Sequence, residues 1–280
     1  MKTSLIVALL ATSLIAACAG RSIFSPPPTP LEKAVDNPTR SAEFRARDRY
    51  RHPLETLQFF DVKADMTVVE IWPGAGWYSE ILAPLLRGRG RYIAAGFVVS
   101  DESSPRWRKD VAEDFAKKFF NAPQLYGHVE ITELGAPDHW KMAEAGSADR
   151  VLTFRNIHNW MAGGYEKEMF AAITTALKPG GILGVVEHRA KPDATLEQMT
   201  KSGYVTEAYV IELATNAGLK LQEKSEINAN PKDSKDYPQG VWTLPPTLRL
   251  GDQDKQKYLD IGESDRMTLR FIKPLLVAPK

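Results

Sequence analysis

The chain of 280 residues carries 36 Lys and Arg against 35 Asp and Glu, which gives a formal net charge of +1. A balanced chain of this kind has no overall positive field, so its composition excludes nucleic-acid binding driven by phosphate contacts. Hydrophobic residues make up 43% of the chain and charged residues 25%, as expected for a globular protein with one large core. The single cysteine, Cys18, excludes an intramolecular disulfide.

Residues 1–17 are predicted to be a signal peptide. Lys2 precedes an almost wholly apolar run, 5–17, which is too short to span a bilayer as a helix. The run ends in Ile-Ala-Ala-Cys, which resembles the lipobox of bacterial lipoproteins, and this resemblance implies that Cys18 is lipidated. Cleavage after Ala19 by the ordinary signal peptidase is the alternative. Either way we expect export, and the lipoprotein resemblance implies anchoring on the periplasmic side, at the outer membrane.

Residues 18–38 are predicted to be the lipidated N-terminus and a tether. Pro26, Pro27, Pro28 and Pro30 favour an extended, semi-rigid spacer that would hold a domain clear of a lipid surface. We therefore expect one folded domain over 39–280, with the lipid anchor as its only connection to the membrane.

Strands and helices alternate along the predicted domain. Helical patterns occupy 41–60, with a break at His52-Pro53, and then 77–86, 111–120, 165–177 and 205–217. Strand patterns occupy 67–71, 91–99, 129–134, 151–154, 182–187, 219–227 and 267–272. This alternation predicts a Rossmann-like α/β fold, with a seven-stranded, mostly parallel sheet covered by helices on both faces.

A loop-rich insertion is predicted at about 228–262, between the last two strands. It contains several prolines but also an apolar stretch at 241–244. Long ordered loops in compact domains are usually functional, so we expect this insertion to fold over the strand ends and shape a pocket.

The segment from Val69 to Gly76, VEIWPGAG, connects the first strand to the next helix. Its glycines allow a sharp turn and close approach of a ligand, and the following helix offers free N–H groups. The segment resembles motif I of the class I S-adenosylmethionine-dependent methyltransferases. LKPGGIL at 177–183 and DRVLTF at 149–154 are similar to segments around strands five and four of that family, and the resemblance covers 54–274.

Longer strings, EIWPGAGWYSEIL among them, resemble a group of predicted bacterial methyltransferases with signal peptides. The resemblance implies an antiparallel last strand, S-adenosylmethionine as cofactor, and methyl transfer to an unknown small molecule or envelope component. It implies cofactor contacts by Glu70, Trp72, Pro73, Gly74, Gly76, Tyr78 and Phe97. The chain departs from the family pattern in two places: Trp72 replaces the usual first glycine, and 94–97 lacks the usual ribose-binding acid.

The candidate catalytic residues follow the fourth and fifth strands. Ligands of open α/β sheets bind beyond the carboxyl ends of the strands, so these residues should share one rim with Glu187. His158 is our candidate base and His188 the second choice. Asn156 or Asn159 would hold the substrate, and Arg155 would pair with an anionic group. The arginines at 45, 47, 49 and 51 are interpreted as a solvated helix.

Two other functions remain open from the sequence. The first is a non-catalytic, exported binding protein that reuses the methyltransferase fold. The second is a metal-assisted hydrolase, because His158, His188, Glu187 and Asn156 are plausible ligand types. No closely spaced His or Cys motif supports a metal centre, so we expect none.

Overall fold

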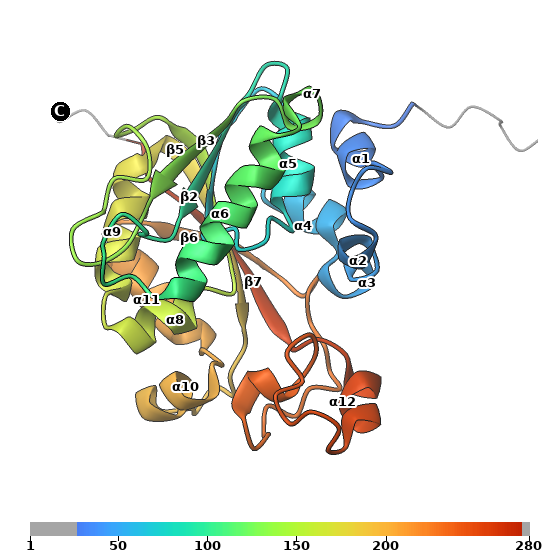
Figure 1. Cartoon of the computed structure of the whole chain (residues 1–280). Helices are drawn as coiled ribbons and strands as arrows, with labels where there is room; N and C mark the ends of the chain where they lie inside the picture. The colour runs from blue at the N-terminus through green and yellow to red at the C-terminus, as the bar shows by residue number, and fades with distance from the viewer. Residues whose placement is uncertain (1–26, 276–280) are drawn as a thin grey trace, which may run out of the picture.

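The computed structural model describes residues 27–275, so the predicted signal peptide and Cys18 lie outside the described residues. A seven-stranded sheet with the order β3-β2-β1-β4-β5-β7-β6 runs through the molecule (Figure 1). Its strands are β1 (Thr67–Ile71), β2 (Arg91–Gly96), β3 (Val129–Glu133), β4 (Ala148–Phe154), β5 (Leu177–His188), β6 (Lys220–Ser225) and β7 (Arg266–Ile272). Only β7 is antiparallel to its neighbours. The predicted Rossmann-like fold with an antiparallel last strand is confirmed.

The central strands are apolar because helices cover both of their faces. β1 is buried along Val68–Ile71, and its Val69 pairs with Ile93 of β2 and Val151 of β4. The strand order reverses between β1 and β4, so a crevice opens beyond their carboxyl ends. Because β7 is antiparallel, its first residue, Arg266, pairs with the last residue of β5, His188.

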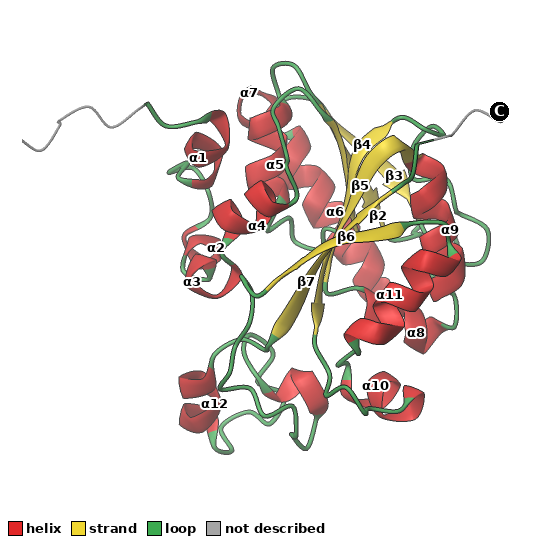
Figure 2. Ribbon diagram, turned by 180° about the vertical axis from the view of Figure 1, so that it is seen from behind, coloured by secondary structure: helices red, strands yellow, loops and turns green. Residues whose placement is uncertain are grey.

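Helices form a layer on each side of the sheet (Figure 2). One layer contains α1 (Pro30–Val35), α4 (Pro53–Phe59), α5 (Ser79–Leu86), α6 (Arg106–Phe120) and α7 (Pro123–Tyr126). The other contains α8 (Ile157–Gly163), α9 (Glu166–Ala176) and α11 (Glu207–Asn216). The short helices α2 (Ala42–Arg45) and α3 (Asp48–Arg51) lie beside α4. Each layer buries its own apolar cluster against one sheet face.

Helix α1 lies within the stretch that was predicted to be a tether. Thr29 forms a capping box with Glu32, and Pro30 occupies the first helical position, where its missing N–H costs nothing. Leu31 and Val35 are buried in the core beside α5. The folded body therefore begins by Pro30 rather than at residue 39, because a proline that suits a spacer equally suits a helix start.

The predicted insertion at 228–262 is ordered and carries its own short helices. These are a 3-10 turn at Gly240–Thr243 and α12 (Lys255–Ile261), and they lie with α10 (Leu196–Ser202) at the end of the sheet where β7 begins (Figure 1). Among residues 27–275, no helix combines the length and apolarity needed to cross a bilayer.

Candidate active site

A cavity of about 310 Å³ lies beyond the carboxyl ends of β1, β4 and β5. Its walls come from the turn after β1, the start of α8, the end of β5, helices α2 and α3, and the insertion. The predicted site residues that line it are Glu70, Trp72, Pro73, Gly74, Tyr78, Phe97, Arg155, Asn156, His158 and His188. The structure thus gathers nearly all of them, from four separate segments, at one place.

The two motif glycines have different roles. Gly74 has a φ of +59° and no atom within 4 Å of the position that a Cβ would take, so its backbone faces open space. Gly76 has a φ of +85°, but a Cβ there would lie 2.7 Å from the Phe119 ring. Gly74 therefore suits close approach of a ligand, whereas Gly76 is required by packing against α6.

The carboxylate of Glu70 lies below the turn, where two hydroxyl groups engage it, although the residue also lines the cavity. It accepts hydrogen bonds from the Ser79 hydroxyl at 2.9 Å and from the Tyr92 hydroxyl at 2.6 Å. Burial raises the pKa of Glu70 to about 7, although both hydrogen bonds act in the opposite direction. Glu70 thus connects β1, β2 and α5, and its protonation state is sensitive near neutral pH.

Trp72 has a left-handed backbone, with a φ of +47°, and is buried. Its indole N–H donates to the carbonyl of Leu134 at 2.9 Å, and its ring packs on Phe97 at a centroid distance of 4.8 Å. The same indole lines a second cavity of about 390 Å³, together with Trp107 and Tyr165. Trp72 therefore forms a wall that the two cavities share.

The site fits S-adenosylmethionine at one end. The family resemblance places the cofactor from the turn after β1 to the end of β2, and the open face of Gly74 suits its methionine part. Towards β2, the rings of Trp72 and Phe97 form the cavity wall. The first acids after β2, which could replace the missing ribose-binding acid, do not line either cavity. Asp101 accepts a hydrogen bond from the Ser103 N–H at 2.8 Å, and Glu102 is exposed.

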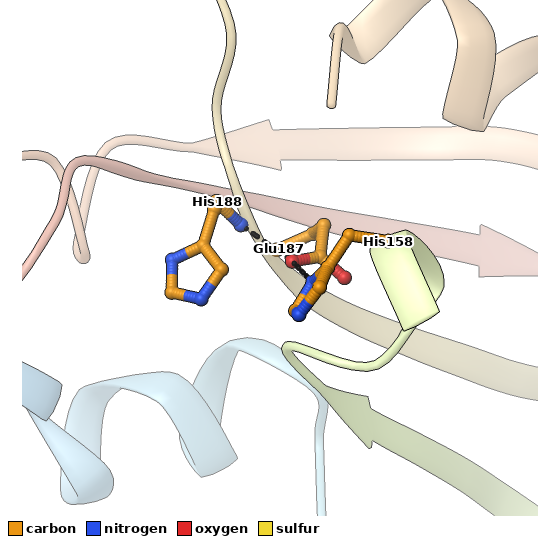
Figure 3. Close-up of side chains that lie close together, drawn as sticks. All are labelled: His158, Glu187 and His188. Carbon is orange, nitrogen blue, oxygen red and sulfur yellow. Dashed lines mark hydrogen bonds and ion pairs between the residues drawn. The ribbon is translucent and has the colours of Figure 1, made fainter. Parts of the chain in front are cut away.

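His158 is fixed by a carboxylate at the end of β5 (Figure 3). Its Nδ1 lies 2.9 Å from Glu187 Oε1, and the same carboxylate accepts from the N–H groups of Ile157 at 2.6 Å and His188 at 2.8 Å. When the carboxylate is the acceptor in this contact, neutral His158 carries its proton on Nδ1. The unprotonated Nε2 remains to accept a proton.

His188 lies on the same side of β5 as His158, with ring centroids 5.2 Å apart (Figure 3). Its Nδ1 is 2.5 Å from the Ser264 hydroxyl. Burial, then the charges of His158 and nearby arginines, hold the pKa of His188 well below its ordinary value. His188 is therefore neutral at pH 7 and a weak base, and its Nδ1 is engaged by Ser264.

His158, Glu187 and His188 bring potential ligand atoms within 4.8 Å of one another, as a metal centre would require. However, Glu187 is already bonded to three N–H groups. The arginines that disfavour a proton on His188 would also disfavour a divalent cation. This electrostatic environment suits a negatively charged ligand better than a metal ion.

The polar residues after β4 have unequal roles. Asn156 precedes α8, and its side-chain amide donates to the Ile71 carbonyl at 2.9 Å, so it positions the loop. Asn159 is exposed and lines the second cavity. Arg155 has a φ of +63°, its backbone N–H donates to Val186 at 2.7 Å, and its side chain lines the first cavity. Of the three, Arg155 offers the freest group to a ligand.

Aromatic rings make up much of the remaining wall. Tyr78 stacks on Phe154 at 3.6 Å, and burial raises the pKa of Tyr78 to about 12, so it stays neutral. From the insertion, the Trp242 ring lies nearly perpendicular to the His158 ring, with ring centroids 6.0 Å apart. The insertion thus contributes to the cavity wall, with Val241, Pro245, Pro246 and Thr247 as further lining residues.

Three charged residues of the cavity were missed by sequence reasoning. Arg47 and Arg51 were assigned to a solvated helix, yet both line the cavity, and Arg51 is only 3% exposed. Both pair with Glu263, which is buried at the end of the insertion. The spacing of four residues puts these two arginines on one helical face, but Arg45 and Arg49 have the same spacing, so it does not identify the pair that faces the cavity.

The fold resembles solved methyltransferase structures along most of the chain. A SAM dependent methyltransferase from Aquifex aeolicus has a TM-score of 0.53 at 15% identity, covering 81% of this chain and 93% of its own. The [4+2]-cyclase SpnF has a TM-score of 0.53 at 16% identity, covering 86% and 85%. No protein-family model and no curated protein matches the sequence. At these identities the likeness establishes the methyltransferase fold.

Proposed function

We propose that this chain is an S-adenosylmethionine-dependent methyltransferase whose acceptor binds in the cavity beside His158. The main support is one juxtaposition: the open Gly74 turn and a histidine fixed by a carboxylate line the same cavity. The similarity of the fold to a SAM dependent methyltransferase from Aquifex aeolicus agrees with this proposal.

Methyl transfer requires little chemistry from the protein beyond alignment and removal of a proton. When bound, S-adenosylmethionine supplies an already activated methyl group. Glu187 orients His158, so that Nε2 can take the proton from an oxygen or nitrogen nucleophile. Glu187 also stabilises the imidazolium that forms. The aromatic wall of Tyr78 and Phe154 limits access of water.

Export and a lipid anchor are part of the proposal and rest on the apolar run at 5–17 and on Cys18. In that case the acceptor is a small molecule or an envelope component on the periplasmic side. Cys18→Ser should remove the protein from the membrane fraction and abolish labelling by a fatty-acid analogue. Unchanged membrane association of the variant would contradict the anchor.

One observation favours a second candidate function, a binding protein that has kept the fold without the cofactor. The buried indole of Trp72 stands between the two cavities, and the carboxylate of Glu70 is engaged by Ser79 and Tyr92. The [4+2]-cyclase neighbour also shows that this fold occurs in a protein named for a different reaction.

Calorimetric titration of the protein from Ser22 onward, with S-adenosylmethionine and S-adenosylhomocysteine, separates the two candidates. Micromolar binding that weakens in Gly74→Ala would support the methyltransferase, because the new Cβ occupies the face that the cofactor should approach. Gly146→Ala is the matched control, since Gly146 has a similar φ of +64° and its Cβ also meets open space, but it lies outside both cavities. Absence of binding by folded protein would favour the binding protein.

A further inference from the structure

We propose that the cavity binds an oxyanion, a carboxylate or a phosphate group, of the methyl acceptor, between the guanidinium groups of Arg47, Arg51 and Arg155. This inference rests on the proposed function only in taking the ligand to be the methyl acceptor. The oxyanion site itself depends on the side chains that line the cavity.

Arg51 is the strongest evidence for such a site. It belongs to α3, is 3% exposed and lines the cavity. Its Nε donates to Glu263 at 3.2 Å, and its guanidinium lies 4.7 Å from the Trp77 ring. Its Nη2 is buried and has no hydrogen-bond partner within residues 27–275. A buried guanidinium nitrogen that lacks a partner is costly unless a ligand supplies one.

Two neighbouring arginines also have guanidinium donors without partners, although both side chains are less buried than that of Arg51. Arg47 donates through Nε to Glu263 at 2.7 Å, while its Nη2 is buried without a partner in the described part of the chain. Arg155, which lies across the cavity on the β4 loop, makes no side-chain hydrogen bond or ion pair with any residue of 27–275. Donors from two separate segments of the chain thus line one space.

The charges around this space do not balance. Arg47, Arg51 and Arg266 surround the carboxylate of Glu263, and Arg155 adds a fourth positive charge. Glu187 is the other carboxylate that acts on Arg155, so four positive charges face two negative ones. Burial acts to raise the pKa of Glu263, but the four arginines together lower it to about 2. Burial and the charge of Arg155 lower the pKa of Arg51. An additional negative charge in the cavity would relieve this repulsion, and a planar or tetrahedral oxyanion matches guanidinium geometry.

The position of Arg155 associates the oxyanion with the acceptor. Arg155 lies three residues before His158, and both side chains line the same cavity as the Tyr78 and Phe154 rings. An acceptor held by its anionic group at Arg155 would place its remaining atoms beside these rings and the His158 base. The carboxylate of the cofactor's methionine part has the same chemistry, so the experiment must distinguish the two sources.

The first part of the experiment measures anion binding by calorimetry on the protein from Ser22 onward, without cofactor. Phenyl phosphate and benzoate are the probes, and phenol is the neutral control. We expect at least one anion to bind ten-fold or more tightly than phenol, and to lose ten-fold in Arg155→Met. Arg155→Lys keeps the charge without the planar guanidinium group, so it should lose less than Arg155→Met. Anions that bind no better than phenol, or equally well to Arg155→Met, would overturn the site.

A matched pair of variants in the N-terminal helical segment separates loss of the anion site from effects on folding. Arg47→Met should weaken the anionic probe at least five-fold, whereas Arg45→Met should not, because Arg45 is exposed and outside the cavity. Thermal unfolding checks that each variant is folded. Equal binding by both variants would remove the helical arginines from the site.

The second part repeats the titration with S-adenosylhomocysteine at saturation. Simultaneous binding of both ligands, or no binding of S-adenosylhomocysteine at all, supports the assignment to a second ligand. Displacement of the probe, together with weaker binding of S-adenosylhomocysteine to Arg155→Met, would instead assign the arginines to the methionyl carboxylate. Failure of S-adenosylhomocysteine to bind would contradict the proposed methyltransferase but not the oxyanion site.

Discussion

Glu70 illustrates how burial gives one side chain a structural and a titrating role. The sequence places it at the end of a strand, where a carboxylate could meet a cofactor, and the structure places it under the turn, bonded to Ser79 and Tyr92. Its pKa of about 7 means that the folded protein retains a proton that the unfolded chain releases near 4.5. The stability of the fold should therefore respond to pH through this residue.

We expect Glu70→Gln to change the pH dependence of stability. Between pH 4.5 and 7 the folded state binds more protons than the unfolded state, so the wild-type contribution of Glu70 falls as pH rises. Relative to wild type, the variant should gain up to about 3 kcal/mol between pH 5 and pH 8. Urea unfolding at both pH values measures this difference.

The control for this measurement is Glu55→Gln, which changes an exposed carboxylate on α4. The stability difference between this variant and wild type should stay within about 0.5 kcal/mol at both pH values. A pH-independent difference for Glu70→Gln would show that Glu70 does not keep its proton in the folded protein.

Glu187 should matter for both stability and the candidate base. The carboxylate of Glu187 now accepts hydrogen bonds from three N–H groups. A glutamine at this position would turn its own amide N–H towards one of these donors. We expect Glu187→Gln to lose about 2–3 kcal/mol in urea unfolding because one buried donor is left unpaired. The exposed Glu197→Gln on α10 is the control and should change stability little. A loss below about 0.5 kcal/mol would contradict this network.

The sequence predicted the histidines and Arg155 at the cavity because strand ends converge in a parallel sheet. It could not place Arg51 or Glu263 there. These two residues meet only because the end of the insertion packs against the N-terminal helices. They are 212 residues apart in the sequence. No local pattern specifies which way a helix of four residues, α3, turns its arginines.

At the scale of elements, α1 shows the limit of composition as a guide. Proline-rich sequence before it favours an extended chain, yet the capping box at Thr29 and the apolar Leu31 and Val35 were present in the sequence. The alternation of strands and helices was sufficient for the central elements, since their apolar periodicity is strong. The short helices of the insertion lack such periodicity and were not predicted.

The contribution of α1 to stability can be measured directly. Leu31 is 8% exposed and packs into the cluster that covers one face of the sheet, so Leu31→Ala should lose about 2–3 kcal/mol. Leu196→Ala, on α10, is the matched control because Leu196 is 56% exposed, and it should lose less than about 0.5 kcal/mol. Equal, small losses for both variants would mean that 30–35 is a tether after all.

At the scale of the whole molecule, the sheet brings two cavities to one edge, and the packed rings of Trp72 and Phe97 line both of them. One cavity contains the Gly74 turn and His158, and the other contains Trp107 and Tyr165 beyond the ends of β2 and β3. A cofactor that spans both must pass the position of the indole. The sequence predicted crowding at Trp72, but the shared wall could be recognised only once β1, β2 and β3 were assembled.

Trp72→Gly should therefore join the two cavities and strengthen binding of S-adenosylhomocysteine at least ten-fold in calorimetry. Glycine suits the φ of +47°, and this relief of backbone strain would offset part of the roughly 3–5 kcal/mol lost with a buried aromatic ring. Trp107→Gly is the control, because Trp107 lines only the second cavity and is 54% exposed. If folded Trp72→Gly binds more weakly than wild type, the indole is part of the binding surface rather than an obstacle, and the cofactor would have to lie against the ring instead of in its place.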